Sequence, residues 1–182
     1  MTIARSLLVA AALATLPSAL FTSSLDAAQH ESHRAGSAAA LVQTVREATE
    51  PFRDARNVPE GYGAVLGCVS GPEAGAMGVH FVNAELLLNN ELKPDQPEAL
   101  IYEFKNGAAR LVGVEFIVLA GVWHETHAPN DPPVLEGHLL QFVDSPNRFG
   151  LPAHYELHVW AWRDNPNGAF VDWNPRVSCE GQ

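Results

Sequence analysis

Five side chains near the C-terminus could do chemistry because of their types and their spacing. Residues 154–162 are typical of a strand, and the side chains of a strand alternate between its two faces. The alternation places these five on one face: His154, Glu156, His158, Trp160 and Trp162. Two imidazoles, a carboxylate and two indoles are unusual for a simple core strand. The segment therefore predicts a pocket for a metal or a small ligand.

The spacing within this segment limits which residues can share one ion. His154 and His158 are four residues apart, so their backbones are separated by about 13 Å on a regular strand. The two imidazoles are then too far apart to bind one ion easily. We expect a metal site of His80, Glu115 and His158, with His154 at its rim. Two imidazoles and one carboxylate suit zinc, copper or iron.

Glu115 is chosen because of its apolar neighbours. Val114 and Phe116 flank it, so we expect Glu115 to be buried, and a buried carboxylate needs a partner. One alternative remains open at this point. His158 and Glu115 would be hydrogen-bonded in a buried polar network that binds no metal.

Other side chains are expected around the site or in its pocket: His154, Glu103, Tyr102, Trp160 and Trp162. Trp160 and Trp162 could stack on a flat ligand or a sugar, although tryptophans at strand spacing are also typical of a core. His124 and His127 lack the histidine spacing of the zinc-protease helix and are interpreted as a loop feature.

No catalytic residue is assigned, because the sequence contains no serine-nucleophile signature, phosphate loop or dinucleotide motif. An enzyme built on this site would use the metal as a Lewis acid, or to activate water or oxygen. Glu115 would then be a metal ligand or a base.

The elements that must position these residues follow from local patterns. Asn106-Gly107 between two apolar runs, 100–104 and 110–118, predicts a two-residue hairpin. That loop would pair Glu103 with Arg110 as a cross-strand charge pair, and Ile101 with Val112. It would also place Glu115 on the face with Leu111, Tyr102, Phe104 and Ile117.

The N-terminal part of the domain is expected to be helical. From Ala38 onward, apolar residues recur at helical spacing: Leu41, Val45, Ala48 and Phe52. Pro51 should end or kink this helix. The expected fold is α+β, a mainly antiparallel sheet or partly closed β-barrel with an N-terminal amphipathic helix.

The start of the chain predicts export. Arg5 and an apolar run from Leu7 to Phe21 are typical of a secretory signal peptide, residues 1–28, although an uncleaved anchor is an alternative. A flexible segment, 29–36, and a single domain, 37–182, would follow. We expect a secreted or periplasmic protein that has no membrane contact after signal removal.

Cysteine usage and charge agree with this interpretation. Cys68 and Cys179 are the only cysteines, and in an exported protein they most simply form a disulfide, although a thiolate metal pair is an alternative. The formal net charge is −10, with two lysines in the chain. Such a chain is repelled by phosphate backbones, so nucleic acid is not an expected partner. The oligomeric state is not predicted.

Four stretches carry a resemblance to known sequences. They are residues 67–72 (GCVSGP), 77–83 (MGVHFVN), 97–103 (PEALIYE) and 158–166 (HVWAWRDNP). Together they resemble a family of exported bacterial proteins without an assigned activity. The resemblance implies a single secreted domain and no reaction.

The function expected from the sequence is that of a secreted or periplasmic protein that binds a small ligand or a metal. The alternatives are a non-catalytic interaction domain with structural histidines, and a module that binds sugars or aromatic compounds through Trp160 and Trp162.

Overall fold

The computed structural model of the chain describes residues 22–71 and 73–181. The apolar run of the expected signal peptide lies outside these residues. The chain divides into two compact units, Met1–His33 and Arg34–Gln182, and every strand belongs to the second unit. Among the described residues, no helix is both long enough and apolar enough to cross a bilayer.

One helix precedes the strands. Helix α1 spans Thr22–Thr49, so it begins before Ala38 and ends before Pro51. Pro51 lies in the first turn of the short 3-10 helix η1, Glu50–Phe52, and a second 3-10 helix, η2, spans Ala55–Asn57. Proline fits there because the first turn of a helix needs no donor from its backbone.

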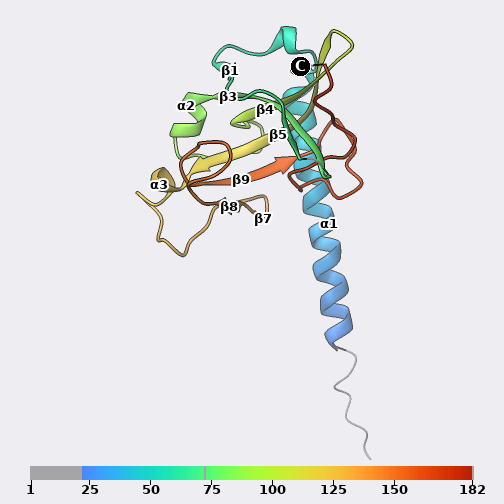
Figure 1. Cartoon of the computed structure of the whole chain (residues 1–182). Helices are drawn as coiled ribbons and strands as arrows, with labels where there is room; N and C mark the ends of the chain where they lie inside the picture. The colour runs from blue at the N-terminus through green and yellow to red at the C-terminus, as the bar shows by residue number, and fades with distance from the viewer. Residues whose placement is uncertain (1–21, 72, 182) are drawn as a thin grey trace, which may run out of the picture. The chain divides into compact units, whose positions relative to one another are not determined.

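A single antiparallel sheet forms the centre of the second unit (Figure 1). Its strands run in the order β1-β3-β4-β5-β9-β8, and β2 pairs with β3 beside this path. Their bounds are β1 Tyr62–Ala64, β2 Val69–Gly71, β3 Gly75–Asn83, β4 Ala99–Lys105, β5 Ala108–Leu119, β8 Gln141–Val143 and β9 His154–Val159. The mixed fold with a mainly antiparallel sheet is therefore confirmed.

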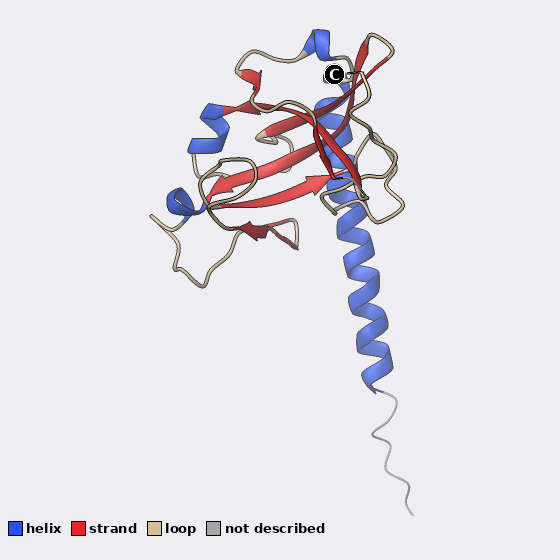
Figure 2. Ribbon diagram, viewed as in Figure 1, coloured by secondary structure: helices blue, strands red, loops and turns tan. Residues whose placement is uncertain are grey.

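The sheet is open, and the expectation of a partly closed barrel is wrong. The end strands β1 and β8 do not pair with each other. Short elements connect the strands: helices α2, Ala84–Leu88, and α3, Ala120–Trp123, and a two-stranded ribbon of β6, Val134–Leu135, and β7, His138–Leu139 (Figure 2).

The larger core lies on one face of the sheet. Alternate residues of the central strands supply it, including Leu100, Tyr102, Val114, Phe116, Leu157 and Val159. Leu41 and Val45 of α1 are fully buried in the same cluster. The amphipathic character of the helix along its whole length stays a prediction.

The register of the β4–β5 hairpin matches the predicted pairing only near its turn. Asn106 and Gly107 form the two-residue loop with φ values of 52° and 75°, and Glu103 is opposite Arg110. A register shift next to Ile101 then places Ile101 opposite Gly113, so the predicted pairing with Val112 is wrong.

This shift is a β-bulge, and it decides which face carries Glu115. One extra residue on β5 reverses the in–out order of everything that follows. Glu115 therefore lies opposite Ala99, on the face away from Tyr102 and Leu111. The predicted grouping with Leu111, Tyr102 and Phe104 is wrong for this reason.

The C-terminal tail is tied to the other face of the sheet. Cys68 and Cys179 form the predicted disulfide, with their Cα atoms 5.6 Å apart. Ala76 and Asn174 exchange backbone hydrogen bonds of 3.2 and 3.1 Å. A second, smaller cluster lies under the tail: Ala76, Ile101, Val112, Trp160 and Val177.

Candidate metal centre and apolar pocket

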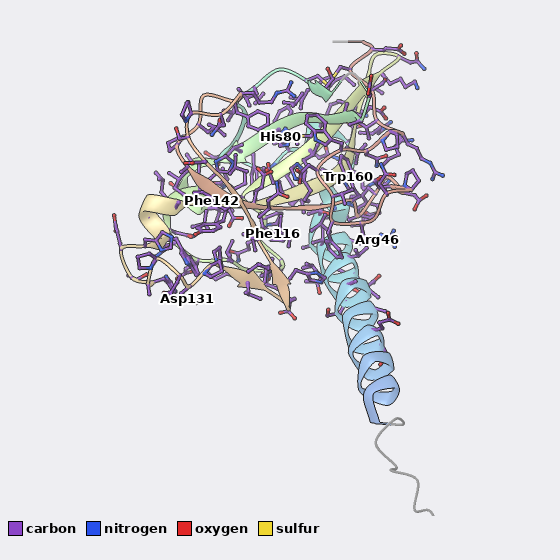
Figure 3. The ribbon with its side chains drawn as sticks, turned by 60° about the horizontal axis from the view of Figure 1, so that its bottom comes forward. Arg46, His80, Phe116, Asp131, Phe142 and Trp160 are labelled. Carbon is purple, nitrogen blue, oxygen red and sulfur yellow. A yellow bond between two sulfur atoms is a disulfide. The ribbon has the colours of Figure 1, made fainter. Side chains whose placement is uncertain are left out.

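Three polar side chains from three strands meet on the face opposite the larger core. His80 comes from β3, Glu115 from β5 and His158 from β9, and they are 7 %, 5 % and 1 % exposed. One ligand atom from each lies within 4.8 Å of the others. Figure 3 labels His80 on this face and Phe116, the neighbour of Glu115, which belongs to the larger core.

The register explains why the three side chains converge. Glu115 is directly opposite His158, so their side chains share a face. Strand β4 separates Glu115 from β3, but it places the small Ala99 beside Glu115 and opposite Val82. The long side chains of His80 and Glu115 can therefore reach each other across β4.

The distances are close to those of ligands around one ion, and shorter at His80 than at His158. His80 Nε2 is 3.4 Å from Glu115 Oε2, and His158 Nε2 is 3.8 Å from Glu115 Oε1. Ligands at zinc distances of 2.0–2.1 Å in tetrahedral geometry are about 3.3–3.5 Å apart. Neither ring nitrogen of His158 has a hydrogen-bond partner among the described residues. Buried polar atoms of this kind require an explanation.

Asp172 lies on the other side of the His158 ring. Its Oδ1 is 3.6 Å from His158 Nδ1, and Gln141 donates a hydrogen bond of 3.3 Å to its Oδ2. When the His158 ring is neutral, a carboxylate on Nδ1 favours the tautomer that carries its proton there, which leaves the Nε2 lone pair directed to Glu115. Glu156, His158 and Asp172 also form a second group with ligand atoms within 4.8 Å. Both groups use His158.

Burial and the neighbouring charges shift the pKa values of the cluster. Burial, with His158 nearby, lowers the pKa of His80 to about 3. Burial also raises the pKa of Glu115. For His158, burial opposes protonation, but the carboxylates of Glu115 and Asp172 outweigh it and the pKa rises. His80 is thus a neutral imidazole with one ring nitrogen lone pair for a ligand, as metal ions require, whereas His158 has to release its proton to bind a metal.

A second acid–imidazole pair borders the cluster. His154 Nε2 is 3.1 Å from Glu156 Oε2, and the peptide oxygen of Pro152 is 2.8 Å from His154 Nδ1. Burial opposes protonation of His154, but these hydrogen bonds raise its pKa overall. Glu156 adds to the effect of burial in raising the pKa of Glu115.

A cavity of about 180 Å³ opens beside these groups. Four ionisable residues line it, namely His80, Glu115, His154 and Glu156. The remaining lining is apolar: Val65, Leu66, Val69, Met77, Val82, Ala84, Leu87, Ile117, Leu119, Phe149 and Leu151. A concave apolar site with a few convergent polar groups is the usual form of a small-molecule site.

The structure brings together only part of the predicted surroundings. His154 lines the cavity, and the Trp160 ring is 6.2 Å from the His158 ring, outside the cavity lining. Tyr102 belongs to the larger core, where its hydroxyl donates to the carbonyl of Phe52. Trp162 packs against the same core and donates to Thr49 Oγ1.

Glu103 has a structural environment of its own. The predicted charge pair of Glu103 with Arg110 is wrong, because Arg110 forms an ion pair with Asp54 instead. Arg163 lies 2.5 Å from Glu103 Oε2, and the backbone N–H of Ser178 donates to Oε1. Glu103 therefore fixes the tail next to the disulfide and does not line the cavity.

Sequence reasoning did not assign two residues of the cluster. The sequence pattern gives Asp172 no role, and it places Glu156 only on the strand face of His154 and His158. The alternation of β9 was a usable signal for Glu156, since Glu156 lies between His154 and His158. Asp172 had no such signal, because only the path of the tail brings it to His158.

Comparisons with protein-family models, curated proteins and solved structures found no match to this chain. The resemblance to exported bacterial proteins stays a prediction. The functional argument therefore depends on the geometry of the chain itself.

Proposed function

We propose that this protein binds a divalent transition metal ion through His80, Glu115 and His158, beside a pocket for a small ligand. The observation that carries the proposal is the separation of the three ligand atoms. One ligand atom from each residue lies within 4.8 Å of the others. The contacts of His80 Nε2 with Glu115 Oε2, 3.4 Å, and of His158 Nε2 with Glu115 Oε1, 3.8 Å, are too long for good hydrogen bonds.

The position of Asp172 supports the same function. A histidine that binds a metal commonly donates its other N–H to a carboxylate, and Asp172 faces His158 Nδ1. Glu115 and His80 both line the cavity, so a coordination position not filled by the protein would face the pocket. A metal there would act as a Lewis acid toward an oxygen or nitrogen atom of a bound molecule.

We also propose that the protein is exported to the periplasm or beyond. The Cys68–Cys179 disulfide supports this, because such bonds persist in oxidising compartments. The signal peptide remains a prediction from residues 1–28.

Metal analysis of tag-free protein tests the proposal. We expect one equivalent of Zn²⁺ per chain after loading and dialysis, and its loss in each of three variants: His80→Ala, Glu115→Gln and His158→Ala. His127→Ala is the matched control, because His127 stacks on Trp123 outside the cluster. Circular dichroism and thermal melting establish that the variants are folded.

The same experiment distinguishes the metal centre from the alternative, a buried polar network that binds no metal. If His158 and Glu115 only form a buried pair, the wild type retains no stoichiometric zinc, copper or iron. Its melting temperature is then unchanged by these ions. That result would refute the metal centre. Retention of metal in His80→Ala and His158→Ala would refute the assignment of the ligands.

A further inference from the structure

The floor and the cover of the cavity differ in chemistry. The four ionisable lining residues all stand on the sheet: His80 on β3, Glu115 on β5, and His154 and Glu156 on β9. The residues that line it from outside the sheet are apolar, among them Leu66, Leu87, Phe149 and Leu151. A molecule held there would place a polar atom on the floor and apolar surface against the cover.

The volume limits the size of that molecule. The cavity measures about 180 Å³. A dry apolar cavity of about 150 Å³ in an engineered protein accepts benzene. One six-membered ring with a short substituent therefore fits, and a disaccharide or a nucleotide does not.

In the metal-free protein, the floor of the cavity disfavours an anion. Glu115 and Glu156 are both buried, and neither lysine nor arginine is among the lining residues. A buried anion without a cationic partner carries a large desolvation cost.

The same groups also disfavour an ammonium ion. Glu156 is already 3.1 Å from His154, and Glu115 lies between His80 and His158 at 3.4 and 3.8 Å. A cation would lose its hydration without finding a free carboxylate. The desolvation cost of a neutral group, such as a hydroxyl or an uncharged ring nitrogen, is much smaller than that of an ion.

We propose that the pocket selects a small neutral molecule, one ring or branched chain in size, that turns a single oxygen or nitrogen atom to Glu115 and His80. This inference rests on the proposed function in one respect, because the polar atom of the ligand would coordinate the metal ion when the metal ion is bound. The apolar cover does not depend on the metal, whereas the charge selection is a property of the metal-free pocket, because a bound metal ion would provide a cationic partner for an anion.

Three probes of one shape test the charge selection: benzyl alcohol, benzylamine and benzoate. Their binding to the full chain is measured by protein NMR titration, with and without one equivalent of Zn²⁺. In the metal-free protein we expect benzyl alcohol to bind at least tenfold more tightly than either ion, a difference of about 1.4 kcal/mol, whereas bound Zn²⁺ would favour benzoate. Equal affinities, or preference for an ion, in the metal-free protein would overturn the inference.

A filled pocket provides the second arm. Leu87→Trp places an indole in the cavity from α2, and we expect at least a tenfold loss of benzyl alcohol binding. Leu88→Trp is the matched control on the same helix, because Leu88 is 58 % exposed and does not line the cavity. Equal losses in the two variants would overturn the proposed location.

A direct measurement covers the case in which Leu87→Trp does not fold. Intermolecular NOEs should connect the benzyl ring protons to methyl groups of Leu87 and Leu151. NOEs only to residues elsewhere would refute the site. Probe binding without Zn²⁺ binding supports the ligand class and refutes the metal centre, whereas Zn²⁺ binding without probe binding does the reverse.

Discussion

Removal of the Asp172 carboxylate tests the reasoning about the candidate metal centre most sharply. Asp172→Asn keeps the size of the side chain but removes the charge next to His158 Nδ1, 3.6 Å away. Loss of a carboxylate that orients a ligating histidine costs about 10–100-fold in metal affinity, or about 1.4–2.7 kcal/mol. Because Asp172 touches no proposed coordination position, the site should remain intact and weaker.

The assay is a competition between the protein and a chromophoric chelator for Zn²⁺. It is repeated at several pH values, because the Asp172 carboxylate also raises the pKa of His158. Without the Asp172 carboxylate the pKa of His158 is lower, so protons compete less with Zn²⁺ for this side chain at low pH. The loss of Zn²⁺ affinity should therefore be largest at high pH. The control is Asp164→Asn, which removes a surface carboxylate of the same tail that pairs with Arg176. The orienting role would be refuted if Asp172→Asn bound Zn²⁺ as tightly as the wild type while His80→Ala bound none.

Three further predictions concern stability and are measured by denaturant unfolding. Burial raises the pKa of Glu98 to about 8 from 4.5, so the wild type should lose stability as pH rises between these values, by on the order of 5 kcal/mol at most. Glu98→Gln should flatten this profile, and an unchanged slope would contradict the burial argument. Replacing Cys68 and Cys179 by serine opens a loop with a sequence separation of 111 and should cost about 2–5 kcal/mol, and no loss would show that the tail is held without the bond. Gly113→Ala brings a Cβ to 2.8 Å from the Val159 carbonyl oxygen and should cost about 1–3 kcal/mol, whereas Gly63→Ala, with open space, should be tolerated.

The hairpin shows where local information ends. Asn106-Gly107 determines the turn and the pairs beside it, because positive φ values at both positions favour these residues. The bulge near Ile101 has no comparable signal in the sequence. It reverses the face of Glu115, so the register beyond the turn could not be extrapolated from the loop.

The candidate site was predicted as a set of residue types more than as a geometry. Burial of Glu115 followed from its apolar neighbours, and the need of a buried carboxylate for partners directed attention to His80 and His158. Pattern alone also suggested Tyr102, which lies in the larger core, and Trp162, which packs against that core. Alternation assigns residues to a face only while the strand continues, and β9 ends at Val159.

By itself, the sequence determined the antiparallel hairpin, the disulfide partners and the chemical types that need burial together. These properties depend on local backbone preference, on cysteine count and on the solvation of single side chains. The tertiary structure alone decided which residues contact His158. Glu115 reaches it through the bulged register of β5. Asp172 reaches it because the disulfide between Cys68 and Cys179, 111 residues apart, holds the tail against the sheet. Distances between residues so far apart in the chain depend on the packing of the whole domain, which no local pattern encodes.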